Sequence, residues 1–292
     1  MRIRSLIIFS LSFTGLSLGA CQSSTSSSNG TSSGGTGGDG GTSGGSSSGA
    51  AAGTGDGGSV SSSQAYLYLQ DSVATHLDIN FDYVAGFQPD ADALSQFNSR
   101  LTDLKTQNLL VKSNGLSLNQ GKQLPANADT NHAYSQAEVE ALFQANQVAS
   151  SQGANAVAYI IYLDGHSDQD TSSGQILGFA FDGDRIAMFA NTIRKVCAQS
   201  SSVLDQGKTC KLAEATVLVH EFGHLLGLVS NGIAMKNAHQ DTAHGAHCNV
   251  KSCVMYWSVN NSSSILDVLG SNSEVPAFDQ GCLDDLALAH TH

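Results

Sequence analysis

Apolar and polar residues follow two different periods along the chain from residue 64 onward. Residues 76–84 alternate polar and apolar side chains, which predicts a half-buried strand, whereas the continuous apolar run 156–163 predicts a strand covered on both faces. A weaker extended stretch covers residues 108–118. Two more apolar runs flank the turn sequence Asp182-Gly183-Asp184, and they predict strands over residues 176–181 and 186–193.

Helical periodicity appears between these strands and after them. Residues 90–105 place four large apolar side chains on one face, namely Leu94, Phe97, Leu101 and Leu104. Ser135 and Glu138 form a capping box that begins a helix running to about residue 150. A third helix is predicted over residues 211–226, since Gly227 suits a left-handed helix end. A final helix is predicted from Asp279 to about residue 290.

The predicted elements define one folded domain, residues 64–292, of the mixed α/β (α+β) class. It should contain a twisted mixed sheet with two helices, then a buried third helix and a small irregular C-terminal subdomain with the final helix. The preceding residues 21–63 are almost wholly Ser, Gly and Thr, a composition that buries nothing and predicts a flexible tether. The net charge of −12 argues against nucleic acid and anionic lipid surfaces as partners.

Residues 1–20 carry the features of an export signal, with basic residues at the start, an apolar centre and a small-residue end. The segment Leu18-Gly19-Ala20-Cys21 resembles the lipobox of bacterial lipoproteins, and the alternative is an ordinary secretory signal. The resemblance implies that Cys21 is lipidated and anchors the chain to a membrane. Gln22, rather than Asp, follows this cysteine, which implies the outer membrane or cell surface.

The candidate chemistry lies in the third helix, at His220-Glu221-Phe222-Gly223-His224. Histidines four residues apart on a helix share one face, so both imidazoles can reach one metal ion. Neutral imidazole suits zinc, and a catalytic zinc site has three protein ligands and one open position. Glu221 lies next to the first histidine, where a general base acts on a zinc-bound water.

His220, Glu221, His224 and Gly227 together resemble the metzincin zinc peptidases, in which a third histidine follows three residues after the glycine. Ser230 occupies that position here. Downstream, His247-Cys248, Cys253 and Met255 are similar to the archaemetzincin arrangement of a zinc histidine, two cysteines and a Met-turn methionine. The resemblance implies that His247 is the third ligand, after an insertion over residues 228–246. The alternatives are His239, His244 and Asp241, or a carboxylate such as Glu274.

The cysteines predict disulfides if the chain is exported. Cys197 with Cys210 would close a loop before the third helix, and Cys248 with Cys253 would brace the Met-turn, leaving Cys282. The alternatives are a bond from Cys282 to either of the latter, or a zinc site made by all three. Archaemetzincins end their pattern with a Cys-x-x-Cys pair, whereas Asp285 stands three residues after Cys282 here, so the resemblance does not supply their second zinc site.

The functional prediction is a lipid-anchored, monomeric zinc endopeptidase that acts on a peptide or protein substrate. His220, His224 and His247 would hold Zn²⁺, and Glu221 would act as the general base. The strand over residues 186–193 would form the edge of the cleft and pair with an extended substrate. The alternative is a non-catalytic, zinc-stabilised surface lipoprotein that serves as a binding module.

Overall fold

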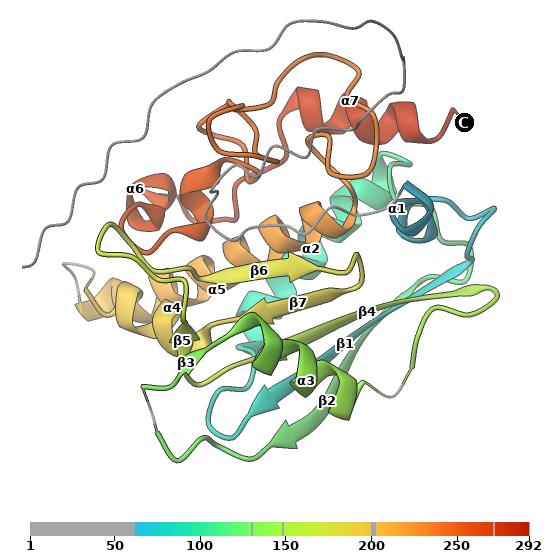
Figure 1. The fold of residues 1–292 in the computed structure, drawn as a ribbon. Coiled ribbons are helices and arrows are strands. Elements are labelled where there is room, and N and C mark those ends of the chain that lie inside the picture. Colours follow the sequence, from blue (N-terminus) through green and yellow to red (C-terminus); the bar gives the residue numbers. More distant parts are fainter. Residues whose placement is uncertain (1–61, 130, 148, 200–202, 271, 292) are drawn as a thin grey trace, which may run out of the picture. The chain divides into compact units, whose positions relative to one another are not determined.

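A computed structural model describes residues 62–129, 131–147, 149–199, 203–270 and 272–291, arranged around one five-stranded sheet (Figure 1). The strand order is β2-β1-β4-β7-β6, in which the first four strands run parallel and β6 is antiparallel to β7. The strands are β1 (His76–Val84), β2 (Leu116–Leu124), β4 (Asn155–Tyr162), β6 (Gly178–Phe181) and β7 (Arg185–Met188). A separate pair joins β3 (Ala133–Tyr134) to β5 (His166–Ser167).

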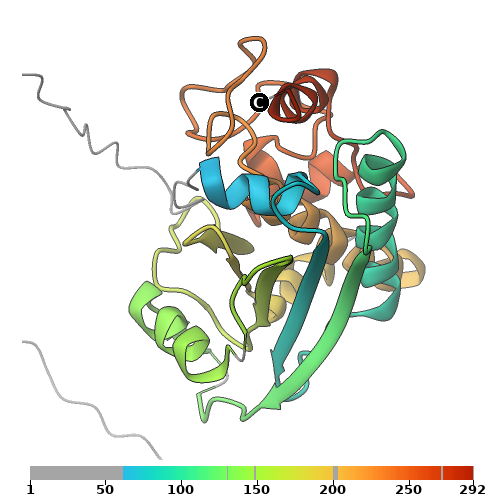
Figure 2. The ribbon, with the colours of Figure 1, turned by 90° about the vertical axis from the view of Figure 1, so that its right-hand side faces the viewer.

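Helices lie on both faces of this sheet (Figures 1 and 2). They are α1 (Ser62–Leu69), α2 (Ala91–Thr106), α3 (Gln136–Asn146), α4 (Ala190–Cys197), α5 (Val203–Leu225), α6 (Ile265–Leu269) and α7 (Gln280–Ala289), with a 3₁₀ helix η1 (Trp257–Asn260). The central strand β4 separates two apolar clusters: Ala158, Ile160 and Tyr162 pack in the cluster that includes α2 and α5. Tyr159, Ile161 and Leu163 pack in the cluster that includes α3. β4 is therefore covered on both faces.

The predicted mixed α/β class is confirmed, and so are the predicted starts of α2 and α3. Asp90 caps α2 by accepting hydrogen bonds from the backbone N–H groups of Asp92 and Ala93. Ser135 and Glu138 form the predicted capping box of α3. The tether and export signal lie outside the described residues, except that α1 already begins at Ser62. Within the described part of the chain, no helix combines the length and apolar character that crossing a membrane requires.

Two predicted strands differ from the structure in a way that matters for the site. The extended stretch over residues 108–118 forms a strand only from Leu116, in β2. The strand over residues 186–193 ends at Met188, and the remainder belongs to α4, whose buried side chains recur at helical spacing as Ala190, Ile193, Val196 and Cys197. β7 also lies between β4 and β6, so the edge of the sheet on this side is β6 and the prediction of an edge strand over 186–193 was wrong.

Candidate metal centres

α5 brings the sequence motif into the interior of the domain. The helix starts at Val203, eight residues before the predicted start, and its last three turns are buried on every side. The helix ends at Leu225, and Gly227, with a φ of +77°, then reverses the chain direction. A Cβ at this position would lie 3.0 Å from Ala65 Cβ and from the backbone nitrogen of Ile233, so the turn has room only for glycine.

His220, His224 and His247 converge beside the C-terminal end of α5. One ligand atom from each lies within 4.8 Å of the others, and all three residues are buried. The Nε2 atoms of His220 and His224 are 3.2 Å apart. Two nitrogens held about 2.0–2.1 Å from one tetrahedral zinc ion lie about 3.4 Å apart, so the imidazoles fit such an ion.

Backbone carbonyls orient two of these rings. His220 Nδ1 lies 2.7 Å from the carbonyl oxygen of Val254, and His247 Nδ1 lies 2.5 Å from that of His244. A carbonyl accepts only from a protonated nitrogen, which places the proton on Nδ1 and leaves Nε2 as the nitrogen that can bind a metal. The tautomers therefore suit a shared ion.

The other proposed third ligands lie elsewhere. His244 is exposed, stacks on Trp257 with ring centroids 4.2 Å apart, and contacts Asp241 Oδ2 through Nδ1 at 2.7 Å. His239 belongs to a second buried group, described below. Glu274 is exposed beside Arg100. Of the predicted candidates, the structure brings only His247 to the other two histidines.

A network of backbone hydrogen bonds closes the segment that carries His247. Asp241 N donates to His247 O at 2.7 Å, and Asn249 N donates to the carbonyl oxygen of His239 at 2.8 Å. Cys248 N donates to Met255 O at 2.8 Å, which ties the segment to the chain beneath the histidines. The predicted insertion, residues 228–246, thus leaves the end of α5 and returns to it, and these backbone hydrogen bonds hold it closed.

Met255 and Glu221 lie on different sides of α5. Met255 is fully buried, and a Cβ added to Gly223 would lie 2.3 Å from its sulfur, so the methionine packs against the helix backbone. Glu221 is also fully buried, and a Cβ added to Gly178 would lie 3.2 Å from its Cγ. Glu221 therefore lies between the histidine motif and the edge strand β6.

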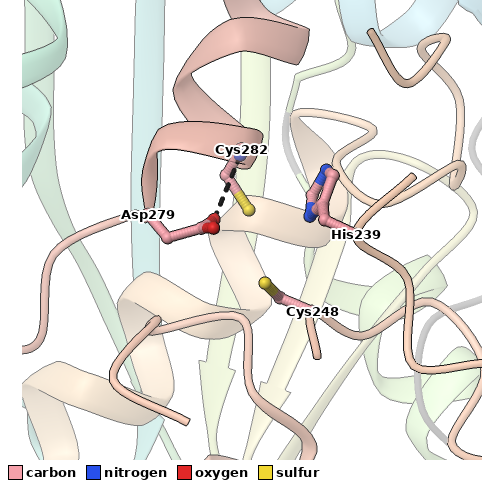
Figure 3. Close-up of side chains that lie close together, drawn as sticks. All are labelled: His239, Cys248, Asp279 and Cys282. Carbon is pink, nitrogen blue, oxygen red and sulfur yellow. Dashed lines mark hydrogen bonds between the residues drawn. The ribbon is translucent and has the colours of Figure 1, made fainter. Parts of the chain in front are cut away.

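A second group of possible ligands lies between the returning segment and α7. Figure 3 shows His239, Cys248, Asp279 and Cys282 converging on one point, and their ligand atoms all lie within 4.8 Å of one another. Cys253 adjoins the group, with its Sγ 3.7 Å from that of Cys282. Hydrogen bonds from the thiols of Cys253 and Cys282 hold the pKa of Cys248 well below its usual range.

The disulfide predictions met different outcomes. Cys197 and Cys210 form the predicted bond. Cys248 and Cys253 do not bond, and with Cys282 they are unbonded, buried thiols among the described residues. The physical reason is that three sulfurs share this space: the Cys253 sulfur interacts with the thiols of both Cys248 and Cys282 and also accepts the backbone N–H groups of Met255 and Asp279, each at 3.4 Å.

Sequence reasoning missed that His239 and Asp285 form a buried pair. His239 Nε2 and Asp285 Oδ2 are 2.8 Å apart, and Asp285 is fully inaccessible to solvent. The available signal was the position of Asp285, which lies on the same face of the final helix as Cys282, Leu286 and Ala289. A carboxylate on the apolar face of a helix requires a partner.

No protein-family model matches the sequence, and no curated protein sequence is similar to it. Among solved structures, the chain resembles an archaemetzincin from Methanopyrus kandleri, with 16% sequence identity and a TM-score of 0.43. The match covers 75% of this chain and 97% of that chain. Sequence identity this low carries no residue roles across to this chain.

Proposed function

We propose that the protein is a zinc-dependent endopeptidase. The observation that supports this most is the convergence of three buried imidazoles, those of His220, His224 and His247. Glu221 lies on the same helix as the first two. Three histidines leave one position of a tetrahedral ion open, as catalytic zinc sites do and structural ones do not. A bound zinc ion would polarise the carbonyl of a peptide bond and lower the pKa of a water molecule towards about 7.

The chain's own residues supply the proton transfers and the substrate's position. Glu221 accepts the proton of the attacking water and delivers it to the leaving amine. β6 is the outermost strand of the sheet on this side, and a Cβ added to Gly178 would lie 3.2 Å from Cγ of Glu221, so an extended peptide paired with β6 would pass this carboxylate. The N–H and C=O groups of successive residues in a strand point alternately to either side. Those of Gly178 bond to the Asn260 side chain and so point away from β7, and those of Ala180, two residues later, should point the same way.

Export and lipidation complete the proposal. Cys21 would carry the acyl chains, and the Ser- and Gly-rich tether would hold the peptidase away from an outer membrane or cell surface. Replacing Cys21 with Ala should release the protein from the membrane fraction of its host without changing the folded domain. Continued membrane association of this variant would contradict the anchor.

The decisive experiment compares two glutamates of α5 by the same substitution. Glu221→Gln removes the base and should keep zinc, while cleavage of a broad peptide library falls by at least about 100-fold. Glu214→Gln changes a buried glutamate earlier on the helix and should retain cleavage. Retained cleavage by Glu221→Gln would remove the assigned role. Zinc binding by the wild type without any cleavage would favour a non-catalytic binding module.

His247 is tested by metal affinity. His247→Ala should weaken zinc binding by at least about 100-fold, because a two-histidine site lacks the donors that zinc requires. His132→Ala is the matched control, since that histidine pairs with exposed Glu138 on another part of the domain. Equal zinc affinity in the His247 and His132 variants would show that another residue completes the site.

A further inference from the structure

A cavity lies at the carboxyl ends of the parallel strands, and we propose that it binds a primary ammonium group carried on a short aliphatic chain. Its volume is about 480 Å³, within the range of small-molecule sites, and none of the candidate metal ligands lines it. Glu214 supplies the carboxylate that accepts the ammonium. This inference goes beyond peptide cleavage and does not depend on it.

The position of the cavity in the sheet is one that favours ligands. β1, β4 and β7 lie side by side and run parallel (Figure 1). Residues 88–91, which lead from β1 into α2, form one wall, and Ile193 and Arg194 of α4, which follows β7, form another. The chain leaves β1 for β2, on one side of it, and leaves β4 for β6 and β7, on the other side. Open α/β sheets bind ligands in the crevice at such a reversal.

α5 forms the third wall, and covalent and ionic contacts fix it to the other two. The disulfide between Cys197 and Cys210 joins α5 to α4. Lys211 of α5 pairs with Asp92 in the first turn of α2. The cavity is therefore present before a ligand arrives, and binding does not have to order its walls.

Glu214 places a carboxyl group at the buried end of the cavity. It is 7% exposed, and its Oε1 accepts the backbone N–H of Asp90 at 2.8 Å, a bond that leaves Oε2 for another donor. Tyr162, the last residue of β4, is fully inaccessible. Its hydroxyl lies close to Glu214 but makes no hydrogen bond of ordinary geometry in the described part of the chain. A ligand with N–H donors at this end satisfies groups that are otherwise costly to bury.

The charges around the cavity favour a cation over an anion. Arg194 and Lys211 are the basic residues of its walls. Lys211 is neutralised by the ion pair described above, and Arg194 donates to the carbonyl oxygen of Gly86 at 2.7 Å. The carboxylates of Asp90 and Glu214 thus outnumber the one cation that is left, and a ligand with one positive charge restores the balance.

The size of the cavity and the apolar part of its walls favour an organic cation. Pro89, Ala91 and Ile193 contribute carbon surface. A water molecule takes up about 30 Å³ of the liquid, so a bare ion would leave most of this space to water. An alkylammonium places its nitrogen at Glu214 and its carbon chain along these apolar residues, as a lysine side chain does on a protein surface. The ligand is therefore a free aliphatic amine or the side chain of a lysine.

The ionisation of Glu214 makes this binding dependent on pH. Burial raises the pKa of Glu214 from 4.5 to about 7, and the Asp90 carboxylate adds to the rise, whereas the Asp90 N–H and the charge of Arg194 oppose it. Only the ionised carboxyl attracts a cation, and its fraction falls from about 0.9 at pH 8 to about 0.1 at pH 6, so an amine should bind about tenfold more weakly at the lower pH. The amine itself stays protonated, since its pKa is close to the value of about 10.4 for lysine.

Titration of the full-length chain with pentylamine at about pH 8 tests the site. We expect saturable binding with a Kd of about 1 mM or tighter, which is reasonable for a ligand of this size. Pentanol, which lacks the charge, and pentanoate, which reverses it, should bind at least about tenfold more weakly. Absence of saturable amine binding, or equal binding of pentanol or pentanoate, would overturn the proposal.

A capped lysine, acetyl-lysine methylamide, distinguishes the two sources of the ammonium. Affinity equal to that of pentylamine assigns the cavity to the lysine side chain of a peptide or protein. Weaker binding of the capped lysine assigns it to a free amine. Both results support the ammonium site, since pentylamine binds in each.

Substitutions locate the binding within the molecule. Glu214→Gln should weaken pentylamine binding by at least about tenfold and remove its pH dependence, because the charged acceptor is lost. A Cβ on Gly207 meets no heavy atom of the described residues within 4 Å, so Gly207→Phe places a large side chain in the cavity that this residue lines and should block binding. Glu140→Gln, on α3, is the matched control and should bind as the wild type does. Wild-type affinity in both cavity variants would overturn the site.

Two further variants separate the cavity from the other polar sites. Tyr162→Phe removes a hydroxyl without a partner, so the free energy of unfolding of the ligand-free protein should not fall, whereas its affinity for pentylamine should. Amines also bind metal ions, and His220→Ala/His224→Ala should therefore be titrated in parallel and keep the wild-type affinity. Loss of amine binding in that double variant, with binding retained in Glu214→Gln, would place the amine at the histidines and overturn the proposal.

Discussion

Gly223 separates the two histidines of α5 and offers a quantitative test of how the methionine is placed. A Cβ at Gly223 would lie 2.3 Å from Met255 Sδ and 3.2 Å from a ring carbon of Phe278. Ordinary contacts between such atoms are about 3.5–4.0 Å, so Gly223→Ala requires a shift of more than about 1 Å in a fully packed region. Such overpacking costs about 1–3 kcal/mol.

Helix propensity opposes this cost, because alanine in a helix interior is favoured over glycine by about 1 kcal/mol. Gly207, on the same helix, has no heavy atom of the described residues within 4 Å of an added Cβ. Gly207→Ala should therefore show the propensity gain alone. We expect the free energy of unfolding of Gly223→Ala to lie about 1–3 kcal/mol below that of Gly207→Ala.

Urea unfolding at one fixed excess of zinc measures this difference. A zinc titration should also show weaker binding by Gly223→Ala, because a shift of Met255 would move its neighbour Val254, whose carbonyl oxygen orients His220. In the background of Met255→Ala, the obstructing sulfur is absent and Gly223→Ala should become stabilising, like the control. If Gly223→Ala stabilises the wild-type protein as much as Gly207→Ala does, the methionine does not pack on the helix as described.

Two further predictions concern a buried carboxylate and the stacked ring pair. Burial raises the pKa of Glu214 from 4.5 to about 7, so the folded state keeps a proton that the unfolded state loses. The free energy of unfolding should therefore fall as pH rises between about 5 and 7, by up to about 3 kcal/mol, and Glu214→Gln should lack this decline. Parallel urea titrations of both proteins test this, and an equal decline in both would contradict it. Trp257→Ala removes the partner of His244, whose carbonyl orients His247, and should weaken zinc binding about 2–10-fold, whereas Trp257→Phe should not. Unchanged affinity in a competition assay with a chromophoric chelator would show that the stack does not hold this segment.

The parts of the fold that the sequence predicted best are those with local causes. The alternation along residues 76–84 and the apolar run 156–163 reflect burial of the strands themselves, and the capping box of Ser135 and Glu138 acts on its own helix. The strand over residues 186–193 failed because its apolar residues suit either a strand or a helix of this length. Packing against α5 and the bond to Cys210 favour the helix.

The candidate site divides in the same way. His220 and His224 share a helix face by local geometry, whereas His247 is placed by contacts between residues far apart in the chain, and only a resemblance pointed to it. His239 meets Asp285 across a separation of 46 residues, which no local pattern encodes. Spacing alone could not distinguish a Cys248–Cys253 disulfide from a cluster that includes Cys282.

The side chain of Asn260 acts as a short piece of an additional strand beside β6. Its Oδ1 accepts the N–H groups of Leu177 and Gly178, and its Nδ2 donates to the carbonyl oxygen of Gly178. An exposed sheet edge offers such groups to any extended chain, including another copy of the same protein. One amide thus closes the start of β6 to partners, and a second polypeptide that joined this edge of the sheet would have to begin beyond Gly178.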